Sequence, residues 1–398
     1  LSKQMNRSGG ESRVPLIKET ESQLNKLLGD FFKGVDLEIE FQTPSFETLL
    51  TTPKLIVDDG FRNAIEHKGH GLQRAVIFSI LRRYAEFMSC PVPEGARRSM
   101  FIAVEEPELY MHPQAQRTIR RVFKDLENGG TQILFTTHSS LLVDVSYFDE
   151  IIRLESQTVG EEHGNGRETK AYQLAVTDLI KDIETRIPGL VGKVTEQSIR
   201  DHYVHAYNPR RSEGFFASKI ILVEGATEEY ALPIYADALE GMALDPHNIS
   251  VVECGGKGPM DRLYRIFNEL RIPCYLLFDY DVGNADRECI RKSKELLELV
   301  GYSGGEPSDI VIEDRFSCFR ETWEKDLSPE IEDSATLKVE AKRELGLNSD
   351  SGKPLIARYI ARQLTQGDSP NVPPTIKAIL KKAITITWSQ SCLSNDQS

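Results

Sequence analysis

The chain has 398 residues, 40% of them hydrophobic and 27% charged, with a formal net charge of −13 at pH 7. At about 150 residues per domain, this length predicts two or three folded domains. The apolar content supports a real core, and the negative balance argues against a histone-like protein coated in positive charge. No apolar stretch reaches the ~18 residues that cross a bilayer, so we expect no membrane span.

The cysteines and the start of the chain bear on its location and extent. None of the six cysteines forms a CxxC pair, which argues against a zinc ribbon or a thioredoxin-type motif. Scattered cysteines favour a reducing cytoplasm, and no secretion leader is evident. The chain opens on Leu1 with no initiator Met, so we expect a fragment of a larger protein.

The first part of the chain has the alternation of an α/β domain. In order, the patterns predict a half-buried strand at 35–42, helix over 61–90, a buried strand at 100–104, a helix at 112–129 and a strand at 131–139. Strand, helix and strand at this spacing predict a parallel sheet.

A middle region precedes a second α/β series. We expect a polar loop at 155–170, helices over 175–205 and a linker at 208–214. Strands then follow at 219–225, 248–256, 274–281 and 309–313, with helices between them and onward to about 385. We therefore expect domains at 1–160 and 217–385, a helical connector at 161–216 and a disordered tail at 386–398.

Three carboxylates in four positions end the strand in "FIAVEEPELYMHP". Like charges at this density call for a cation. Glu105 would sit by Mg²⁺, usually through water, and Glu106 would polarise a water that attacks a γ-phosphate. His138, at the end of the next parallel strand, could touch the same phosphate.

Glycines open the preceding helix in "KGHGLQR". Gly69 and Gly71 allow close backbone approach, and the helix start that carries Gln73 favours an anion. These three pieces, in this order, resemble the second half of an ABC-type ATPase head: its signature loop, Walker B with D-loop, and H-loop. The plainer alternative is an α/β core with a solvated acidic turn.

One part of an ATPase is missing from the sequence. No G-x-x-x-x-G-K-[ST] occurs anywhere, so no P-loop cradles the phosphates. We expect ATP to be a cofactor of the complete protein, and this chain alone not to hydrolyse it efficiently.

A second group of carboxylates lies at the strand ends of the second series. Glu224 ends one strand and Glu228 lies on the following first turn, while Asp279 and Asp281 end a strand 279 − 224 = 55 residues on. All four can meet at the carboxyl edge of a parallel sheet, where sites form. Their combined charge is prohibitive unless Mg²⁺ or Mn²⁺ binds; the alternative is a solvated acidic edge.

The pattern E-G-x-T-E … D-x-D resembles a Toprim domain, the metal fold of topoisomerases, primases and some nucleases. The resemblance implies a two-metal site with Glu324 and neighbouring Thr322 as second-metal ligands, for which Asp326 and Glu332 compete. It also implies a later lysine, Lys353, that neutralises charge in the transition state.

An ABC ATPase head followed directly by a Toprim domain is the organisation of OLD ("overcoming lysogenization defect") nucleases, shared by Gabija-type defence nucleases. The resemblance implies an α/β fold, with a partial head and then a Toprim domain bearing helical additions. It further implies metal-dependent DNA cleavage, dimerisation through the ATPase part, and a role in phage defence or DNA repair. The catalytic candidates are Glu224, Glu228, Asp279, Asp281, Lys353, Glu106 and His138.

Two further expectations concern DNA. Basic residues at 97–98, 117, 120–121 and 210–211 could hold its backbone, with little base readout. The alternative function is an ATP-gated DNA-binding or scaffold protein whose Toprim fold is primase-like or inactive.

Overall fold

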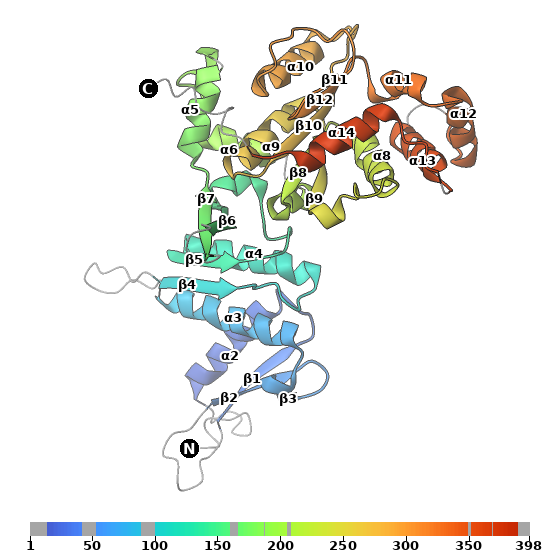
Figure 1. Ribbon diagram of the computed structural model, residues 1–398. Helices are drawn as coiled ribbons and strands as arrows, with labels where there is room; N and C mark the ends of the chain where they lie inside the picture. Colours follow the sequence, from blue (N-terminus) through green and yellow to red (C-terminus); the bar gives the residue numbers. More distant parts are fainter. Residues whose placement is uncertain are drawn as a thin grey trace. The chain divides into compact units, whose positions relative to one another are not determined.

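The structure is a computed structural model that describes residues 14–41, 53–88, 100–159, 166–186, 188–204, 208–348, 352–367 and 369–388 (Figure 1). Contacts between Cα atoms divide the chain into two units, residues 1–142 and 143–398. Both units are α/β, as the alternating patterns predict, and their sheets mix parallel and antiparallel strands.

The first unit begins with a small antiparallel sheet, β1 (Asp36–Phe41), β2 (Pro53–Asp58) and β3 (Asn63–Ala64). Helix α2 (Pro15–Leu28) packs on β1 and on α3 (His70–Met88). The strand expected at 35–42 is confirmed. The helix expected over 61–90 begins only at His70, because β3 and the 3-10 turn η2 (Ile65–His67) precede it.

A parallel pair of strands carries the candidate ATPase motifs. Strand β4 (Met100–Glu105) pairs with β5 (Thr131–Thr136), so that Glu105 lies opposite Thr136. Helix α4 (Pro113–Asn128) connects them and packs its apolar face on the first unit's core (Figure 1). The parallel arrangement is confirmed, and both strands deliver their carboxyl ends to one edge.

The strand predicted at 100–104 is confirmed as β4, but its predicted burial is wrong. Only Met100, Ile102 and Val104 pack against the core, whereas Phe101 is 58% exposed. On β5, Leu134 is 49% exposed. An apolar run does not reveal that helices cover only one face of this two-stranded sheet.

The second unit is built on a five-stranded sheet in the order β11-β12-β10-β8-β9. Strands β8 (Lys219–Val223), β9 (Ile249–Glu253), β10 (Cys274–Asp279) and β12 (Phe316–Phe319) are parallel, and β11 (Val311–Ile312) is antiparallel to β12. The predicted strands are confirmed; β12 was missed because it spans only four residues.

Helices cover both faces of this sheet (Figure 1). Helices α9 (Lys257–Glu269) and α10 (Arg287–Leu299) pack on one face, against Leu222 and Phe278. Helices α8 (Ala226–Asp237), α13 (Lys353–Thr365) and α14 (Pro374–Thr385) pack on the other, against Val223 and Leu277. Short α11 (Trp323–Leu327) and α12 (Ser334–Glu344) complete the unit.

The loop expected at 155–170 is instead largely an antiparallel hairpin, β6 (Ile152–Val159) and β7 (Gly166–Gln173). Its polar composition reflects exposure of the strands, and Glu155 lies opposite Lys170 as a favourable cross-strand pair. Helices α5 (Val176–Arg186) and α6 (Glu196–Val204) follow, as expected, interrupted by η4 (Pro188–Leu190).

The linker expected at 208–214 is ordered and packed. Helix α7 (Pro209–Ser212) runs into η5 (Glu213–Phe216), and Ser212 donates from its hydroxyl to the Val143 carbonyl oxygen at 3.0 Å. Phe215 joins the core of the second unit, to which residues 143–204 also contribute. Three further 3-10 turns are η3 (Val145–Glu150), η6 (Asp245–His247) and η7 (Ser328–Glu330). The tail expected to be disordered over 386–398 is packed at its start: Ile386 is buried in the core, and Trp388 donates from Nε1 to the Asn268 carbonyl oxygen at 2.9 Å. Residues 389–398 lie outside the described residues.

Candidate functional site

The carboxyl edge of the second sheet brings the two predicted glutamates together. Glu224 directly follows β8, and Gly225 then caps α8. Glu228, in the first turn of α8, accepts the Gly225 backbone N–H on Oε2 at 3.2 Å. This capping bond turns the Glu228 side chain back towards the strand end.

The two aspartates lie at the same edge. Asp279 is the last residue of β10, and its N–H donates to Glu224 Oε2 at 3.3 Å. Its own Oδ1 accepts the Trp323 N–H at 3.0 Å. Asp281 lies beyond the strand in the left-handed region (φ 63°), held by a 3.2 Å bond from its N–H to the Glu321 carbonyl oxygen. The sequence predicts that the strand continues through Asp281, so that the two aspartates point the same way by strand alternation. In the structure β10 ends at Asp279, and a turn places Asp281 instead.

Burial makes ionisation of this group unfavourable. Burial and the neighbouring Glu224 charge raise the pKa of Glu228, which is 5% exposed, to about 8. Burial, and then the charges of Glu228 and Glu224, hold the pKa of Asp279 well above its ordinary value. Burial also raises the pKa of Glu224. The edge therefore carries more buried negative charge than its surroundings balance.

One cation at this edge is a residue that we did not single out from the sequence. Lys257, the first residue of α9, is 4% exposed and pairs through Nζ with Asp281. The same Nζ lies 3.6 Å from Glu224 Oε2 and 3.3 Å from Cys289 Sγ. Although burial disfavours its charge, Glu224 and Asp281 raise the pKa of Lys257. Its signal was a Gly-Gly-Lys one residue after the end of β9.

The expected second-metal residues lie around α11. Thr322 caps that helix, accepting the Lys325 N–H on Oγ1 at 3.4 Å. Glu324 adds to the charges that raise the pKa of Asp279, after burial and the nearer carboxylates, and its Oε1 lies 3.9 Å from Lys353 Nζ.

Asp326 and Glu332, the two other candidates for the second-metal ligand, are less suitable than Glu324. Asp326 accepts the Glu321 N–H at 2.8 Å and so fixes the turn before α11. Glu332 is exposed, and no contact described at the acidic edge includes it. Glu324 is therefore the better candidate.

The donor chemistry of this edge fits a hard divalent cation. Within the described residues, no three or more His, Cys, Asp and Glu side chains are already arranged as a metal-binding group. Lys257 instead provides one positive charge among Glu224, Asp281 and their neighbours. Carboxylate oxygens are the ligands that Mg²⁺ and Mn²⁺ prefer, and such a cation would relieve the repulsion.

The first unit brings Glu106 and His138 together. Glu106 has a left-handed backbone (φ 41°) and its N–H donates to the Thr136 carbonyl oxygen at 3.1 Å. Its Oε1 lies 3.5 Å from His138 Nε2, and the His138 side chain is 82% exposed. Glu105, next to them, is exposed.

Glu108 holds the loop that carries His138 through two hydrogen bonds. It is 8% exposed, and its Oε1 accepts the Thr137 hydroxyl at 2.7 Å and the His138 N–H at 2.9 Å. The third acid of "EEPE" is thus a structural group that fixes the loop carrying His138.

The glycine-bearing helix start packs on the same loop region. A Cβ on Gly71 would lie 2.8 Å from the Tyr110 carbonyl oxygen, so close approach there is to protein backbone. Gln73 donates from Nε2 to the Lys68 carbonyl oxygen at 2.9 Å. A Cβ on Gly69 would meet no atom of the described residues within 4 Å, so Gly69 faces open space.

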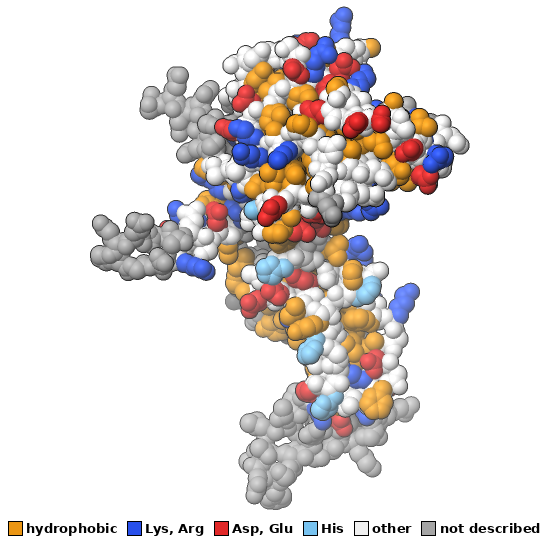
Figure 2. All heavy atoms as spheres, turned by 45° about the vertical axis from the view of Figure 1, so that its right-hand side comes forward, with side chains coloured by type: hydrophobic (Ala, Val, Ile, Leu, Met, Phe, Trp, Pro, Cys, Tyr) orange, Lys and Arg blue, Asp and Glu red, His pale blue; other side chains and the backbone are white. Residues whose placement is uncertain are grey.

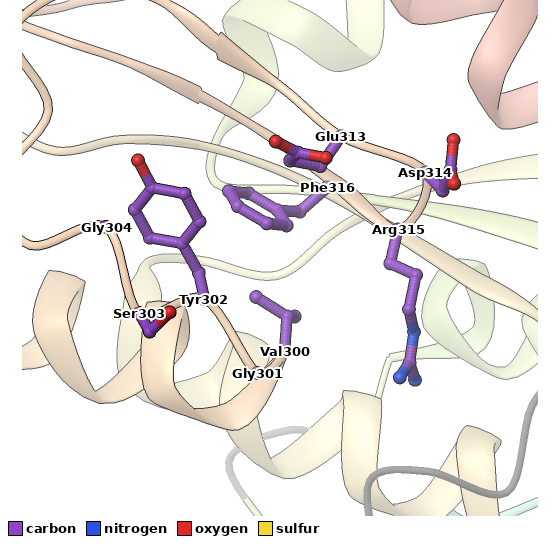
Figure 3. Close-up of a pocket in the computed structure, with 9 residues that line it drawn as sticks. All are labelled: Val300, Gly301, Tyr302, Ser303, Gly304, Glu313, Asp314, Arg315 and Phe316. Carbon is purple, nitrogen blue, oxygen red and sulfur yellow. The ribbon is translucent and has the colours of Figure 1, made fainter.

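A separate pocket of about 330 Å³ lies at the opposite edge of the second sheet (Figure 3). Its walls are the turn after α10, residues 300–304, and residues 313–316 before and within β12. Phe316 pairs with Leu276, three residues before Asp279, so the pocket lies about 10 Å along the strands from the acidic edge. It is not part of the candidate site.

The basic residues expected to hold DNA have mixed surroundings. Arg117 and Arg121 are exposed on α4, whereas Arg211 Nη2 pairs with Glu253 Oε2 at 3.2 Å. The pair at 97–98 lies outside the described residues. On the face in Figure 2, Lys and Arg side chains are interspersed with Asp and Glu over the second unit.

None of the helices that the structure describes is long and apolar enough to cross a membrane.

Two family models match the chain in the order that the motifs predict. Residues 5–143 match an AAA ATPase domain, and residues 215–281 match the Toprim domain of proteins like the overcoming lysogenization defect protein. The chain thus joins an ATPase-type unit to a Toprim unit.

Named relatives extend this match. The chain is 25% identical over 279 residues to the Old nuclease of Escherichia phage P2, covering 68% of this chain and 44% of that protein. It is 28% identical over 247 residues to endonuclease GajA of Bacillus cereus, and this match covers 58% of this chain and 33% of GajA. The resemblance to the OLD family is confirmed, and the chain spans less than half the length of these relatives.

A solved C-terminal region of the Xanthomonas campestris OLD protein is 21% identical. The match covers 43% of this chain and 94% of that one, with a TM-score of 0.30.

Proposed function

We propose that this chain is part of a divalent-metal-dependent DNA endonuclease of the OLD type. The observation that carries the proposal is the convergence of Glu224, Glu228 and Asp279 at one sheet edge, Glu228 buried and the other two half-buried, all with raised pKa values. Such an arrangement is costly for folding and is typical of a site that binds cations. The OLD-like Toprim match and the relatives named as nucleases supply the reaction class.

In this proposal, Glu224, Glu228, Asp279 and Asp281 hold Mg²⁺ or Mn²⁺, and Glu324 with Thr322 completes a second set. When bound, these ions supply an activated water and stabilise the charge that develops on the phosphate. Glu228, in the first turn of α8 beside Glu224, is a candidate to help deprotonate the attacking water once metal is bound. Lys353, exposed beside Glu324, can reach a phosphate oxygen.

The first unit would regulate or dimerise the nuclease. We propose that Glu105, Glu106 and His138, with Gly69, Gly71 and Gln73, form the nucleotide-facing half of the head. The head expected over 1–160 corresponds to the compact unit 1–142, and the connector expected at 161–216 packs with the nuclease expected at 217–385 in the second unit. Free thiols at Cys254, Cys274, Cys289 and Cys318 suit a reducing cytoplasm, and relatedness to GajA suits phage defence.

A plasmid-nicking assay tests this function. With Mn²⁺, we expect the wild-type chain to convert supercoiled plasmid to open circles, and Asp279→Ala to reduce that rate at least a hundredfold. Glu240→Gln, on an exposed residue after α8, is the control and should nick as wild type does. Cleavage that persists in Asp279→Ala would remove the nuclease from this edge.

The alternative is an ATP-gated DNA-binding or scaffold protein with an inactive Toprim fold. It predicts that the wild-type chain shifts DNA in a binding assay yet leaves it intact at every Mn²⁺ and Mg²⁺ concentration.

A further inference from the structure

Lys257 lies where an acidic metal site would hold positive charge. Its ammonium contacts Asp281 directly and lies 3.6 Å from Glu224 Oε2, and its side chain is 3% exposed. A lysine on a solvated helix face usually keeps its charged end in water, so full burial of this one requires the carboxylates around it.

The backbone fixes this lysine from the same strand end. Gly255 and Gly256, both with positive φ (78° and 111°), turn the chain sharply between β9 and α9. The Gly256 N–H then donates to the Glu224 carbonyl oxygen at 2.9 Å. Lys257 therefore starts α9 on a backbone tied to the residue that its ammonium neutralises.

We propose that Lys257 is a built-in counter-ion that occupies the cation position of the metal-free edge and competes with one divalent metal ion for Glu224 and Asp281. The inference rests on the proposed function and adds a positioning residue to it. A divalent ion held at about 2 Å from these oxygens would lie close to the ammonium and repel it. Occupancy of that position by metal therefore requires the ammonium to give up Asp281, and Cys289 Sγ, at 3.3 Å, is a neighbour towards which it can turn.

The competing idea is that Lys257 assists metal binding by keeping Asp281 ionised and in place. The two ideas predict opposite signs for one substitution, Lys257→Met, which keeps the length of the side chain and removes its charge. Competition predicts tighter metal binding in the variant, and assistance predicts weaker binding.

Calorimetric titration with Mn²⁺ and thermal unfolding with EDTA or Mn²⁺ distinguish them. For Lys257→Met we expect a lower Tm in EDTA, because buried carboxylates lose their partner. We also expect a Mn²⁺ dissociation constant roughly tenfold or more below that of the wild type, and a larger rise of Tm on adding Mn²⁺. Lys377→Met, exposed on α14, removes the same charge elsewhere and should match the wild type in all three measurements.

The failures of this inference and of the proposed function look different. Unchanged or weaker Mn²⁺ binding by Lys257→Met, with normal binding by the wild type, overturns competition and leaves the metal site standing. Absence of Mn²⁺ uptake by both proteins overturns the metal site itself and the competition with it. A wild-type titration abolished by Asp279→Ala locates the binding at this edge.

Discussion

Buried like charges are the feature of single residues that most constrains the second unit. Glu228 retains a proton in the folded chain up to a pKa of about 8, whereas its ordinary value is 4.5. Between these values the folded state binds more protons than the unfolded state does, so the free energy of unfolding falls as the pH rises.

We therefore expect the metal-free protein to lose stability between about pH 5 and pH 8. The contribution of Glu228 is about 1 kcal/mol per pH unit, and Asp279 and Glu224 act in the same direction. Glu228→Gln imitates the neutral form and should give a flatter profile, while Glu240→Gln should keep the wild-type slope. Urea unfolding in EDTA at several pH values measures the free energy of unfolding. If it falls equally steeply with pH in Glu228→Gln and the wild type, Glu228 is not the source of the pH dependence.

Glu108 makes a comparable contribution to the first unit by hydrogen bonding. Glu108→Ala leaves the Thr137 hydroxyl and the His138 N–H without their acceptor. Both hydrogen bonds are half-buried, and each is worth about 1 kcal/mol, so we expect a lower Tm for the first unit. Glu127→Ala breaks only an exposed pair with Lys124 and serves as the control. Equal Tm values for the two variants would show that the loop does not depend on Glu108.

At the scale of elements, the strand ends were predictable and their surroundings were not. Apolar runs ending in acids identified β4, β8 and β10. For β8 and β10 the reason is that a buried parallel strand must be apolar and its carboxyl end must leave the sheet; β4 is apolar although one of its faces is exposed. Lys257 escaped notice because its role depends on β9 lying beside β8, a pairing that only the folded chain shows. The hairpin β6–β7 escaped because its residues are largely polar, including those on its half-buried face such as Arg153, and so look like a loop.

The segment 208–214, which the sequence predicts to be a linker, allows a direct test of packing. A Cβ on Gly214 would lie 2.7 Å from Phe267 Cζ and 2.9 Å from Ile220 Cδ1, both buried core atoms. Gly214→Ala should therefore overpack the core and lower the free energy of unfolding by about 1–3 kcal/mol. Gly189→Ala, where a Cβ would meet nothing described within 4 Å, should change it little. A flexible linker would tolerate both substitutions equally.

In the molecule as a whole, both units place carboxylates at the ends of parallel strands, but the burial of these carboxylates and the charges next to them differ. At the second edge Glu228 is buried, Glu224, Asp279 and Asp281 are half-buried, and Lys257 balances part of their charge. At the first edge, Glu105 is exposed and Glu106 faces an exposed His138. The first edge is thus open to a ligand that brings its own phosphates and metal, which a P-loop would normally hold.

Because the sequence has no P-loop, this chain alone should turn over ATP at a negligible rate, even with Glu106 and His138 in contact distance. A phosphate-release assay should give the same background for wild type and Glu106→Gln. Adding DNA should leave this background unchanged, because DNA supplies no cradle for the phosphates of ATP. Strong hydrolysis that disappears in Glu106→Gln would mean that other residues of this chain cradle the phosphates, and the division of labour between the two units would then have to be redrawn.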